Sequence, residues 1–299
     1  MPRVAVVIPT YNRASLLERA IDSVLKQTYR DYEVIVVDDG SEDGTADLME
    51  RQKSCRYIRL PHSGLPAVAR NTGVRSTAAP FIAFLDSDDR WREDKLEKQV
   101  AEIRFQRAGL VCSNASVAPD GRGVTMPYLR PGQGRSGWVL LDLIADNFVI
   151  TSSVLMRREV FELAGGFSES PAFRIVEDFG LWLSAAVFTD FHYLPDELVI
   201  YNTSGSRLSR EIDTMVHWRA RFQILSAFLS SAEREPEVVA AVSSQLDGCR
   251  SALCDLFIDR HSFRNFASVF LRFSCRRPWP ALKYAAGRIL KKHENPAHS

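Results

Sequence analysis

Four short apolar runs, each closed by turn residues, divide the first ninety residues of the chain. They are VAVVIPT at 4–10, EVIVVDDG at 33–40, CRYIRLP at 55–61 and PFIAFLD at 80–86. Most of these positions are apolar without regular alternation, which is typical of parallel strands covered on both faces. The pattern therefore predicts four buried, parallel strands.

The segments after the first two runs have helical periodicity. Leu17, Ile21 and Val24 fall on one face of residues 15–28, and a second helix is predicted over 45–53. Alternating strands and helices form βαβ units, whose ligand sites gather beyond the carboxyl ends of the strands. We therefore expect a Rossmann-like, nucleotide-binding α/β half.

The pattern changes after about residue 105. Strand candidates follow at 109–117, 150–158 and 191–202 without regular intervening helices, which predicts a mixed central sheet. From about residue 210 onward only helical patterns remain. We expect an α/β domain over 1–209 and a helical C-terminal subdomain over 210–299.

Composition narrows the class of protein. The 299 residues carry a net charge of +1, which gives no global reason to expect a nucleic-acid partner. The five cysteines are widely spread and form no Cys-x-x-Cys pair, which argues against a zinc site or a disulfide framework. The N-terminus lacks the regions of a signal peptide, and acids interrupt the longest apolar window, 137–156. We expect a cytoplasmic protein without a membrane span.

Polar segments follow three of the predicted strands. PTYNR closes the first, DDGSEDGT the second and DSDD the fourth, so all three are expected at one edge of the sheet. The chain lacks a G-x-G-x-x-G fingerprint there, which argues against an ordinary dinucleotide site. The convergence instead favours another kind of nucleotide pocket.

Each segment also has a purely structural interpretation. Asp38 to Ser41 can form a turn and cap the next helix, or Asp39 can accept a hydrogen bond from a base or ribose. Tyr11 can be a core aromatic residue or a flat surface for base stacking. Sequence reasoning leaves both alternatives open.

Three carboxylates, Asp86, Asp88 and Asp89, occupy four positions after the fourth strand and repel one another unless a cation is near. A helix cap explains only one of them. Mg²⁺ and Mn²⁺ bind few protein carboxylates and complete their shell with water and substrate phosphates. An EF-hand does not fit, because Arg90 and Trp91 stand at its later positions. We therefore expect Mn²⁺ or Mg²⁺ bound jointly with a diphosphate.

Five motifs, in order, resemble those of glycosyltransferase family 2, inverting enzymes with a GT-A fold. They are VVIPTYNR, VIVVDDGSEDGT, ARNTGV, FLDSDD and VEDFGLWL, and the resemblance spans about residues 3–209. The segment ESPAFRIVED is especially similar to the SpsA-like bacterial transferases. The ordered set is far more specific than any single motif.

The resemblance implies roles for seven residues. Those expected to bind the donor are Thr10, Tyr11, Asp39, Arg70 and Asp86. Asp88 matches the metal ligand of the D-x-D motif, and Asp178 matches the catalytic base. Without the family, Glu177 and Asp178 would be interpreted as acids in the first turn of a helix.

Two features leave questions open. Many relatives have a histidine shortly after the last strand, where this chain has Ser204, with Arg207 as a possible substitute on the phosphate. From His261 onward the tail is basic, and aromatic residues are interleaved with the basic ones. This pattern is typical of peripheral contact with an anionic membrane, here the inner face of the plasma membrane. It is equally typical of a helix that packs on the catalytic domain.

The leading hypothesis is a metal-assisted transferase that moves a sugar, most simply from a UDP-sugar, to a saccharide or lipid-linked acceptor in surface-polysaccharide synthesis. A sugar nucleotidyltransferase is the first alternative, but IPTYNRAS lacks the Gly-rich loop that this class needs. A non-catalytic binder of nucleotide sugars is the second. The chain has all three of Asp86, Asp88 and Asp178, which argues against a non-catalytic binder.

Overall fold

The computed structural model of the chain describes residues 3–106, 108–117, 126–202, 214–231 and 234–260. The chain divides into two compact units, Met1–Glu211 and Ile212–Ser299. Ser204, Arg207 and the basic tail from His261 lie outside the described residues, so the expectations for them stay predictions.

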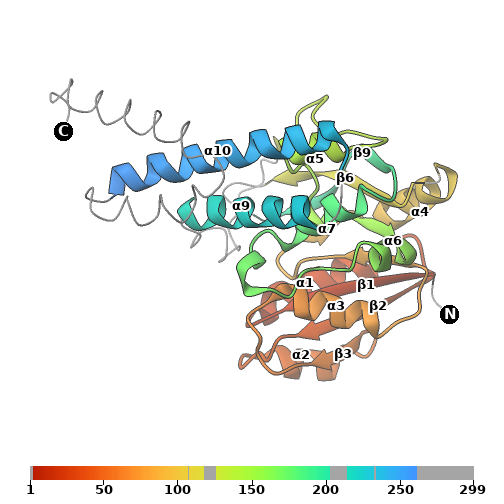
Figure 1. Cartoon of the computed structure of the whole chain (residues 1–299). Helices are drawn as coiled ribbons and strands as arrows, with labels where there is room; N and C mark the ends of the chain where they lie inside the picture. The colour runs from red at the N-terminus through yellow and green to blue at the C-terminus, as the bar shows by residue number, and fades with distance from the viewer. Residues whose placement is uncertain (1–2, 107, 118–125, 203–213, 232–233, 261–299) are drawn as a thin grey trace. The chain divides into compact units, whose positions relative to one another are not determined.

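The described residues of the first unit contain one nine-stranded sheet, with the order β3-β2-β1-β4-β8-β6-β9-β5 and β7 paired to β6 (Figure 1). The strands are β1 Val4–Thr10, β2 Tyr32–Asp38, β3 Arg56–Arg59, β4 Phe81–Phe84, β5 Arg90–Trp91, β6 Leu110–Val117, β7 Met126–Pro127, β8 Leu155–Arg157 and β9 Phe191–Tyr201. Pairing is parallel from β3 through β4 and antiparallel on both sides of β8. The mixed α/β sheet predicted from the sequence is confirmed.

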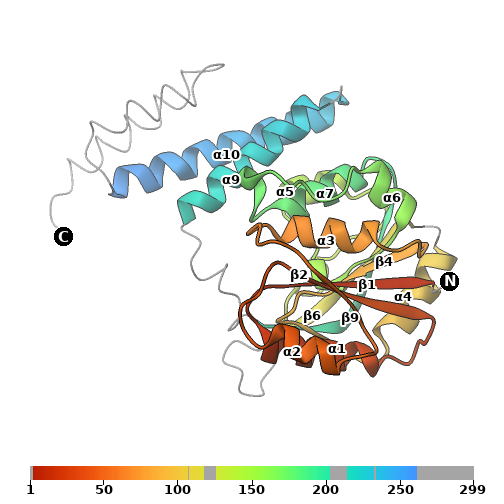
Figure 2. The ribbon, with the colours of Figure 1, turned by 90° about the horizontal axis from the view of Figure 1, so that it is seen from below.

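Helices cover both faces of the parallel strands (Figure 2). Those of this unit are α1 Ala14–Leu25, α2 Thr45–Arg51, α3 Pro66–Arg75, α4 Lys95–Phe105, α5 Leu140–Ala145, α6 Arg158–Leu163 and α7 Glu177–Ala185. Val4, Val6 and Ile8 of β1 pack in a core cluster with α1, α2 and α4, while Val7 lies under α3. All seven residues of β1 are buried, which explains its unbroken apolar run.

One predicted strand is shorter than expected. Residues 150–158 were expected to be extended throughout, but Thr151–Ser153 forms a turn of 3-10 helix and only Leu155–Arg157 is strand. The hydroxyl of Ser153 donates to the carbonyl of Ile150 at 2.7 Å. Such local side-chain bonds compete with strand pairing, and they hold the hydroxyls of this turn at the edge of the sheet.

The second unit is helical in its described part, with α9 Thr214–Ser230 and α10 Pro236–Arg260 packed against each other. Buried apolar residues include Ile224, Leu225 and Phe228 of α9 and Val238 and Val242 of α10. Among the described residues, no helix is both long and apolar enough to cross a bilayer.

Gly73 sets how closely α3 approaches the sheet. A Cβ atom there would lie 2.4 Å from Cγ1 of Val7, so Gly73→Ala forces the helix away from β1. We expect a loss of about 1–3 kcal/mol in the free energy of unfolding, because overpacking outweighs the better helix propensity of Ala.

Urea denaturation measures this loss. Gly248→Ala in α10 is the matched control, because its Cβ would meet nothing within 4 Å. It should be neutral or stabilising by up to about 1 kcal/mol. Equal stability of the Gly73 variant and the unchanged protein would contradict the packing argument.

Candidate functional site at the carboxyl edge of the sheet

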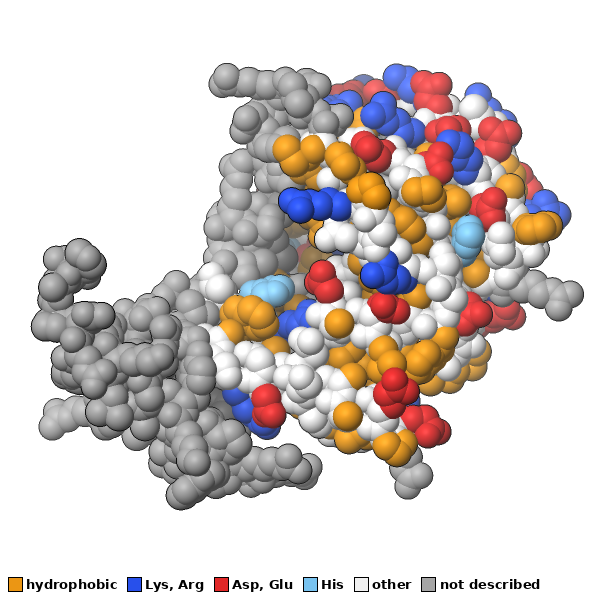
Figure 3. Space-filling view, turned by 90° about the horizontal axis from the view of Figure 1, so that it is seen from above, with side chains coloured by type: hydrophobic (Ala, Val, Ile, Leu, Met, Phe, Trp, Pro, Cys, Tyr) orange, Lys and Arg blue, Asp and Glu red, His pale blue; other side chains and the backbone are white. Residues whose placement is uncertain are grey.

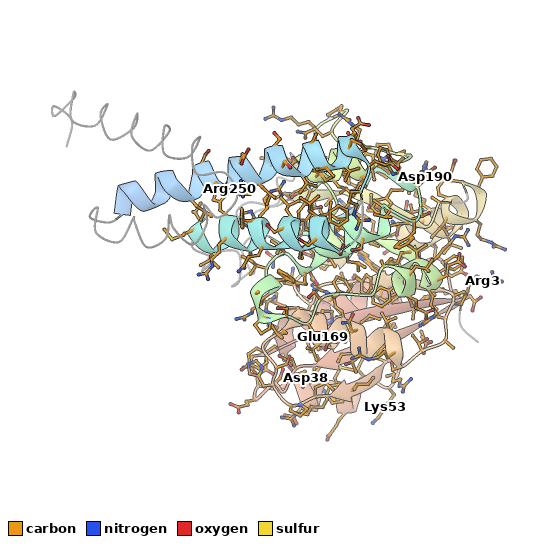
Figure 4. All side chains as sticks on the ribbon, in the orientation of Figure 1. Arg3, Asp38, Lys53, Glu169, Asp190 and Arg250 are labelled. Atoms are coloured by element: carbon orange, nitrogen blue, oxygen red, sulfur yellow. The ribbon has the colours of Figure 1, made fainter. Side chains whose placement is uncertain are left out.

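Strands β1, β2, β4, β6 and β9 run in the same direction, so their carboxyl ends meet at one edge of the sheet. In Figure 4, Arg3 before β1 and Asp38 at the end of β2 mark the two opposite edges. Thr10 ends β1, Asp39 follows β2, and Asp86 and Asp88 follow β4. The structure therefore brings the sequence-predicted acids to a common edge.

Arg70, on α3, joins two acidic segments that are far apart in the chain. Its guanidinium donates to Asp86 at 2.6 Å and to Glu177, the first residue of α7, at 2.9 Å. The side chain is buried and also lies over the ring of Phe167. Because desolvation disfavours the charge, Arg70 depends on these two carboxylates, which together raise the pKa of its guanidinium.

The two acids at the start of α7 face different partners. Burial raises the pKa of Glu177 to about 7, although Arg70 opposes this shift. Asp178 accepts from the hydroxyl of Thr151 at 3.2 Å and from the amide of Phe179 at 2.6 Å, while burial raises the pKa of its carboxyl. The pKa of Glu177 is raised despite its ion pair, because burial outweighs the effect of Arg70 and the charge of Asp178 adds to the effect of burial.

Asp88 forms an ion pair with Arg13, whose guanidinium donates to its Oδ2 at 2.6 Å. Burial, and then the charge of Asp86, raise the pKa of Asp88 against the effect of Arg13. Arg13 therefore does not fully offset burial and the charge of Asp86, although Asp86 itself is paired with Arg70. The carboxylates retain a preference for a further cation.

Asp89 differs from the other two acids of DSDD. It is almost fully buried and accepts from the hydroxyl of Ser152 at 2.5 Å and from the amide of Asn202 at 2.9 Å. The same Ser152 oxygen accepts from the amide of Asp86 at 3.0 Å. Asp89 thus links the loop after β4 to the 3-10 turn before β8 and to the residue after β9.

Thr10, Tyr11 and Asp39 form a second corner of the edge. The amide of Asp39 donates to the carbonyl of Thr10 at 2.9 Å. The ring of Tyr11 stacks on His62, with centroids 4.0 Å apart and planes 17° apart, and the residue is 39% exposed. Tyr11 is therefore neither a buried core residue nor an isolated surface ring.

Two further aromatic residues reach this edge. Tyr128, after β7, and Tyr201, at the end of β9, meet edge to face with ring centroids 5.7 Å apart. Burial, and then the charges of Asp89 and its acidic neighbours, raise the pKa of Tyr201. Burial also raises the pKa of Tyr128, and the charges of Asp146 and Asp178 add to this shift. The pair thus lies within electrostatic range of both the DSDD acids and Asp178.

Sequence reasoning missed the residues that hold these acids in place. They are Arg13, His62, Thr151 and Ser152. A signal existed only for Arg13, because it closes the polar PTYNR segment. The others lie in segments that were expected to be turn or strand, and their partners are more than twenty residues away.

The donor chemistry of the edge fits a hard divalent cation. Asp86 and Asp88 offer carboxylate oxygens, which Mg²⁺ and Mn²⁺ prefer. Within the described ranges, no group of three or more Asp, Glu, His or Cys side chains is placed to hold a metal. Mg²⁺ is usually bound through only one or two protein carboxylates, with a ligand's phosphates and water completing its coordination shell.

The described surface shown in Figure 3 mixes positive and negative side chains instead of gathering one sign. This mixture agrees with the net charge of +1. The face shown in this view therefore offers an anionic ligand no broad basic patch among its described side chains.

The family model for glycosyl transferase family 2 matches residues 5–164, just over half of the chain. The chain belongs to this family, and the expectation of a family 2 glycosyltransferase is confirmed. TuaG of Bacillus subtilis, a putative teichuronic acid biosynthesis glycosyltransferase, is 30% identical over 61% of this chain and 71% of its own length. TarP of Staphylococcus aureus, a poly(ribitol-phosphate) beta-N-acetylglucosaminyltransferase, is 34% identical over 52% of this chain and 48% of its own.

The matches to another relative and to solved structures differ in length. An uncharacterized glycosyltransferase of Rickettsia felis is 43% identical, but the match covers 33% of this chain and 17% of that protein. Among solved structures, S. aureus TarS 1-349 in complex with UDP has a TM-score of 0.62 at 21% identity, covering 90% of this chain and 75% of that one. The mannosyltransferase PcManGT of Pyrobaculum calidifontis has a TM-score of 0.60 at 20% identity, covering 97% and 87%. These likenesses confirm the GT-A fold.

The raised pKa of Glu177 predicts a pH-dependent stability. Its carboxyl keeps a proton up to a pKa of about 7 in the folded state, whereas the ordinary pKa of a glutamate carboxyl is 4.5. The free energy of unfolding should therefore fall as the pH rises from about 4.5 to 7, by roughly 1–3 kcal/mol from this group.

Glu177→Gln removes this contribution, so its urea-unfolding curves should depend less on pH in that window than those of the unchanged protein. Glu159→Gln, at an exposed glutamate on α6, is the matched control and should follow the unchanged protein. Identical pH slopes for the Glu177 variant and this control would refute the assignment.

Proposed function

We propose that the protein transfers a sugar from a nucleotide-sugar donor, a UDP-sugar, to a hydroxyl of a saccharide or lipid-linked acceptor in cell-surface polysaccharide synthesis. The observation that carries the proposal is the buried Arg70 bridge, which places Asp86 and the start of α7 at one edge of the sheet. Three relatives support this class of product by their names. They are TuaG, TarP and the Escherichia coli protein WfaP, a glucosyltransferase that acts on a diphosphoundecaprenol-linked sugar.

Unsatisfied polar atoms support a ligand at this edge. Among the described residues, Oγ1 of Thr10 and Nε of Arg70 are buried and lack a hydrogen-bond partner. Buried polar groups are almost always paired, so such atoms at a polar edge favour a bound partner. Thr10, Tyr11, Asp39, Arg70 and Asp86 are the proposed donor-binding residues.

Asp88 is the proposed protein ligand of Mn²⁺ or Mg²⁺, with Asp86 beside it. When bound, the cation would act as a Lewis acid that offsets negative charge on the departing nucleoside diphosphate. Arg13 already donates to Asp88, so it holds this carboxylate in position and places a second positive charge near the phosphates. The metal-bound neighbour PcManGT, whose complex contains GDP-Man and Mn²⁺, supports the class of cation.

Asp178 is the proposed general base. Its carboxyl takes the proton of the acceptor hydroxyl as that oxygen attacks the anomeric carbon on the face opposite the diphosphate, which gives inversion. Burial raises the pKa of Asp178. A higher pKa makes the carboxylate a stronger base. Thr151 and the Phe179 amide hold its two oxygens in place.

Metal-dependent nucleotide binding tests the donor site. We expect Asp88→Ala to reduce the affinity for UDP in the presence of Mn²⁺ by at least about tenfold, measured by calorimetry, because the shared ligand of cation and diphosphate is lost. Asp190→Ala is the matched control, because this residue precedes β9 at the opposite edge (Figure 4). Unchanged UDP affinity after Asp88→Ala would contradict the assignment of Asp88.

Asp178→Asn separates binding from chemistry. The variant is nearly isosteric but cannot accept a proton, so transfer should fall by about 10²–10⁴-fold while the UDP dissociation constant stays within about twofold. A thermal-shift screen of UDP-, dTDP- and GDP-sugars with Mn²⁺ identifies the donor for this assay. Retained turnover would assign the base elsewhere.

A further inference from the structure

Two adjacent residues of the 3-10 turn before β8 contact the two halves of the proposed site. The hydroxyl of Thr151 donates to Oδ2 of Asp178, the proposed base, at 3.2 Å. The hydroxyl of Ser152 accepts from the amide of Asp86 at 3.0 Å and donates to the carboxylate of Asp89 at 2.5 Å. One turn therefore joins the base to the loop that carries the proposed metal ligand.

The backbone of this turn is itself held by buried side chains from β5 and α4. Nε1 of Trp91 donates to the carbonyl of Ser152 at 2.8 Å, and Nε2 of Gln99 donates to the carbonyl of Ser153 at 2.7 Å. Nζ of Lys95 donates to Oε1 of Gln99 at 2.6 Å and lies 3.9 Å from the centre of the Trp91 ring. Trp91, Lys95 and Gln99 are at most 3% exposed. Because breaking one of these bonds would leave a buried polar atom unpaired, the network fixes the turn in one position.

The reaction proposed above needs such a fixed support. Displacement with inversion requires the acceptor oxygen on one face of the anomeric carbon and the diphosphate on the other. The base and the metal ligand must therefore keep a constant separation, since a misplacement of about 1 Å can cost about 10²-fold in rate. Arg70 joins the same two segments, but it does so through Glu177, one residue before the base. The turn acts on Asp178 itself.

We propose that the turn Thr151–Ser153 is a positioning element for sugar transfer, in which Thr151 orients Asp178 and Ser152 fixes the loop that carries Asp88. This inference rests on the proposed function. Both residues act through carboxylates and neither needs to contact the sugar. Because they act on different halves of the site, loss of the Thr151 hydroxyl should slow transfer, whereas loss of the Ser152 hydroxyl should weaken binding of the metal and diphosphate.

Steady-state transfer by the full chain, combined with titration of UDP in Mn²⁺, tests the role of Thr151. Thr151→Val removes the hydroxyl from a side chain of the same shape, so kcat should fall about tenfold while the UDP dissociation constant stays within about twofold. Thr151→Ser keeps the hydroxyl and should recover most of the lost kcat. A purely structural role would not produce this separation of kcat from UDP affinity together with rescue by serine.

Ser152→Ala should show the opposite pattern. The loop after β4 loses its bond between Ser152 and Asp89, so UDP affinity in Mn²⁺ should fall about five- to tenfold. The affinity for UDP without metal should change by less than about twofold. Ser152 is fully buried, so urea denaturation must show that the variant is folded. If it is unfolded, Thr151→Val and its rescue by Thr151→Ser decide the inference.

Thr28→Val is the matched control. Thr28 also donates to a carboxylate, that of Glu97 at 2.7 Å, but it lies exposed in the loop between α1 and β2. It should leave kcat and UDP affinity unchanged. An unchanged kcat in Thr151→Val, a UDP affinity that falls together with kcat, or no recovery in Thr151→Ser overturns the role of the turn while the proposed function stands. If the unchanged protein transfers no sugar and binds no nucleoside diphosphate, the proposed function fails, and this inference with it.

Discussion

The site depends on the balance of charge around the buried guanidinium of Arg70. Acids from the β4 loop and from α7 gather at one edge of the sheet, and burial raises the pKa values of Asp88, Glu177 and Asp178. Arg70 bonds Asp86 and Glu177 at once, so one cation holds together segments that are about ninety residues apart. Removal of Arg70 would leave the buried carboxyl of Glu177 without its counter-ion, which is more costly than breaking a surface pair.

The sheet fixes the positions of the elements that carry these charged side chains. Side chains on both faces of β1 and β2 are buried, and α3, which carries Arg70, lies so close to β1 that Gly73 leaves no room for a side chain. Because α3 is fixed in this way, the long Arg70 side chain starts from a defined point. Hydrogen bonds from Ser152 and Asn202 to Asp89 similarly fix the β4 loop, so Asp86 and Asp88 are held where they repel each other.

The sequence predicted the strands well and the connections between them poorly. Apolar runs located β1 and β4 closely, because a strand buried on both faces needs apolar residues at successive positions. The acids at the strand ends were also visible, since parallel strands end at one edge. No local pattern indicated that Ser152 bonds Asp89 or that His62 bonds Asp39, because these contacts depend on segments that meet only after folding. The 3-10 turn at Thr151–Ser153 was predicted as strand for a different reason, because the local bond from Ser153 to Ile150 is not visible in the pattern of apolar positions.

The adjacent acids Glu177 and Asp178 are suited to different tasks by their surroundings. Glu177 is buried and directs its carboxyl to Arg70, so it cannot leave this pair without exposing a buried charge. Asp178 is partly exposed, and its neighbours donate only neutral hydrogen bonds, from Thr151 and from the Phe179 amide. Each oxygen of Asp178 therefore keeps a lone pair that no guanidinium occupies. These surroundings support the proposal that Asp178 is the base, while Glu177 remains paired with Arg70 beside Asp86.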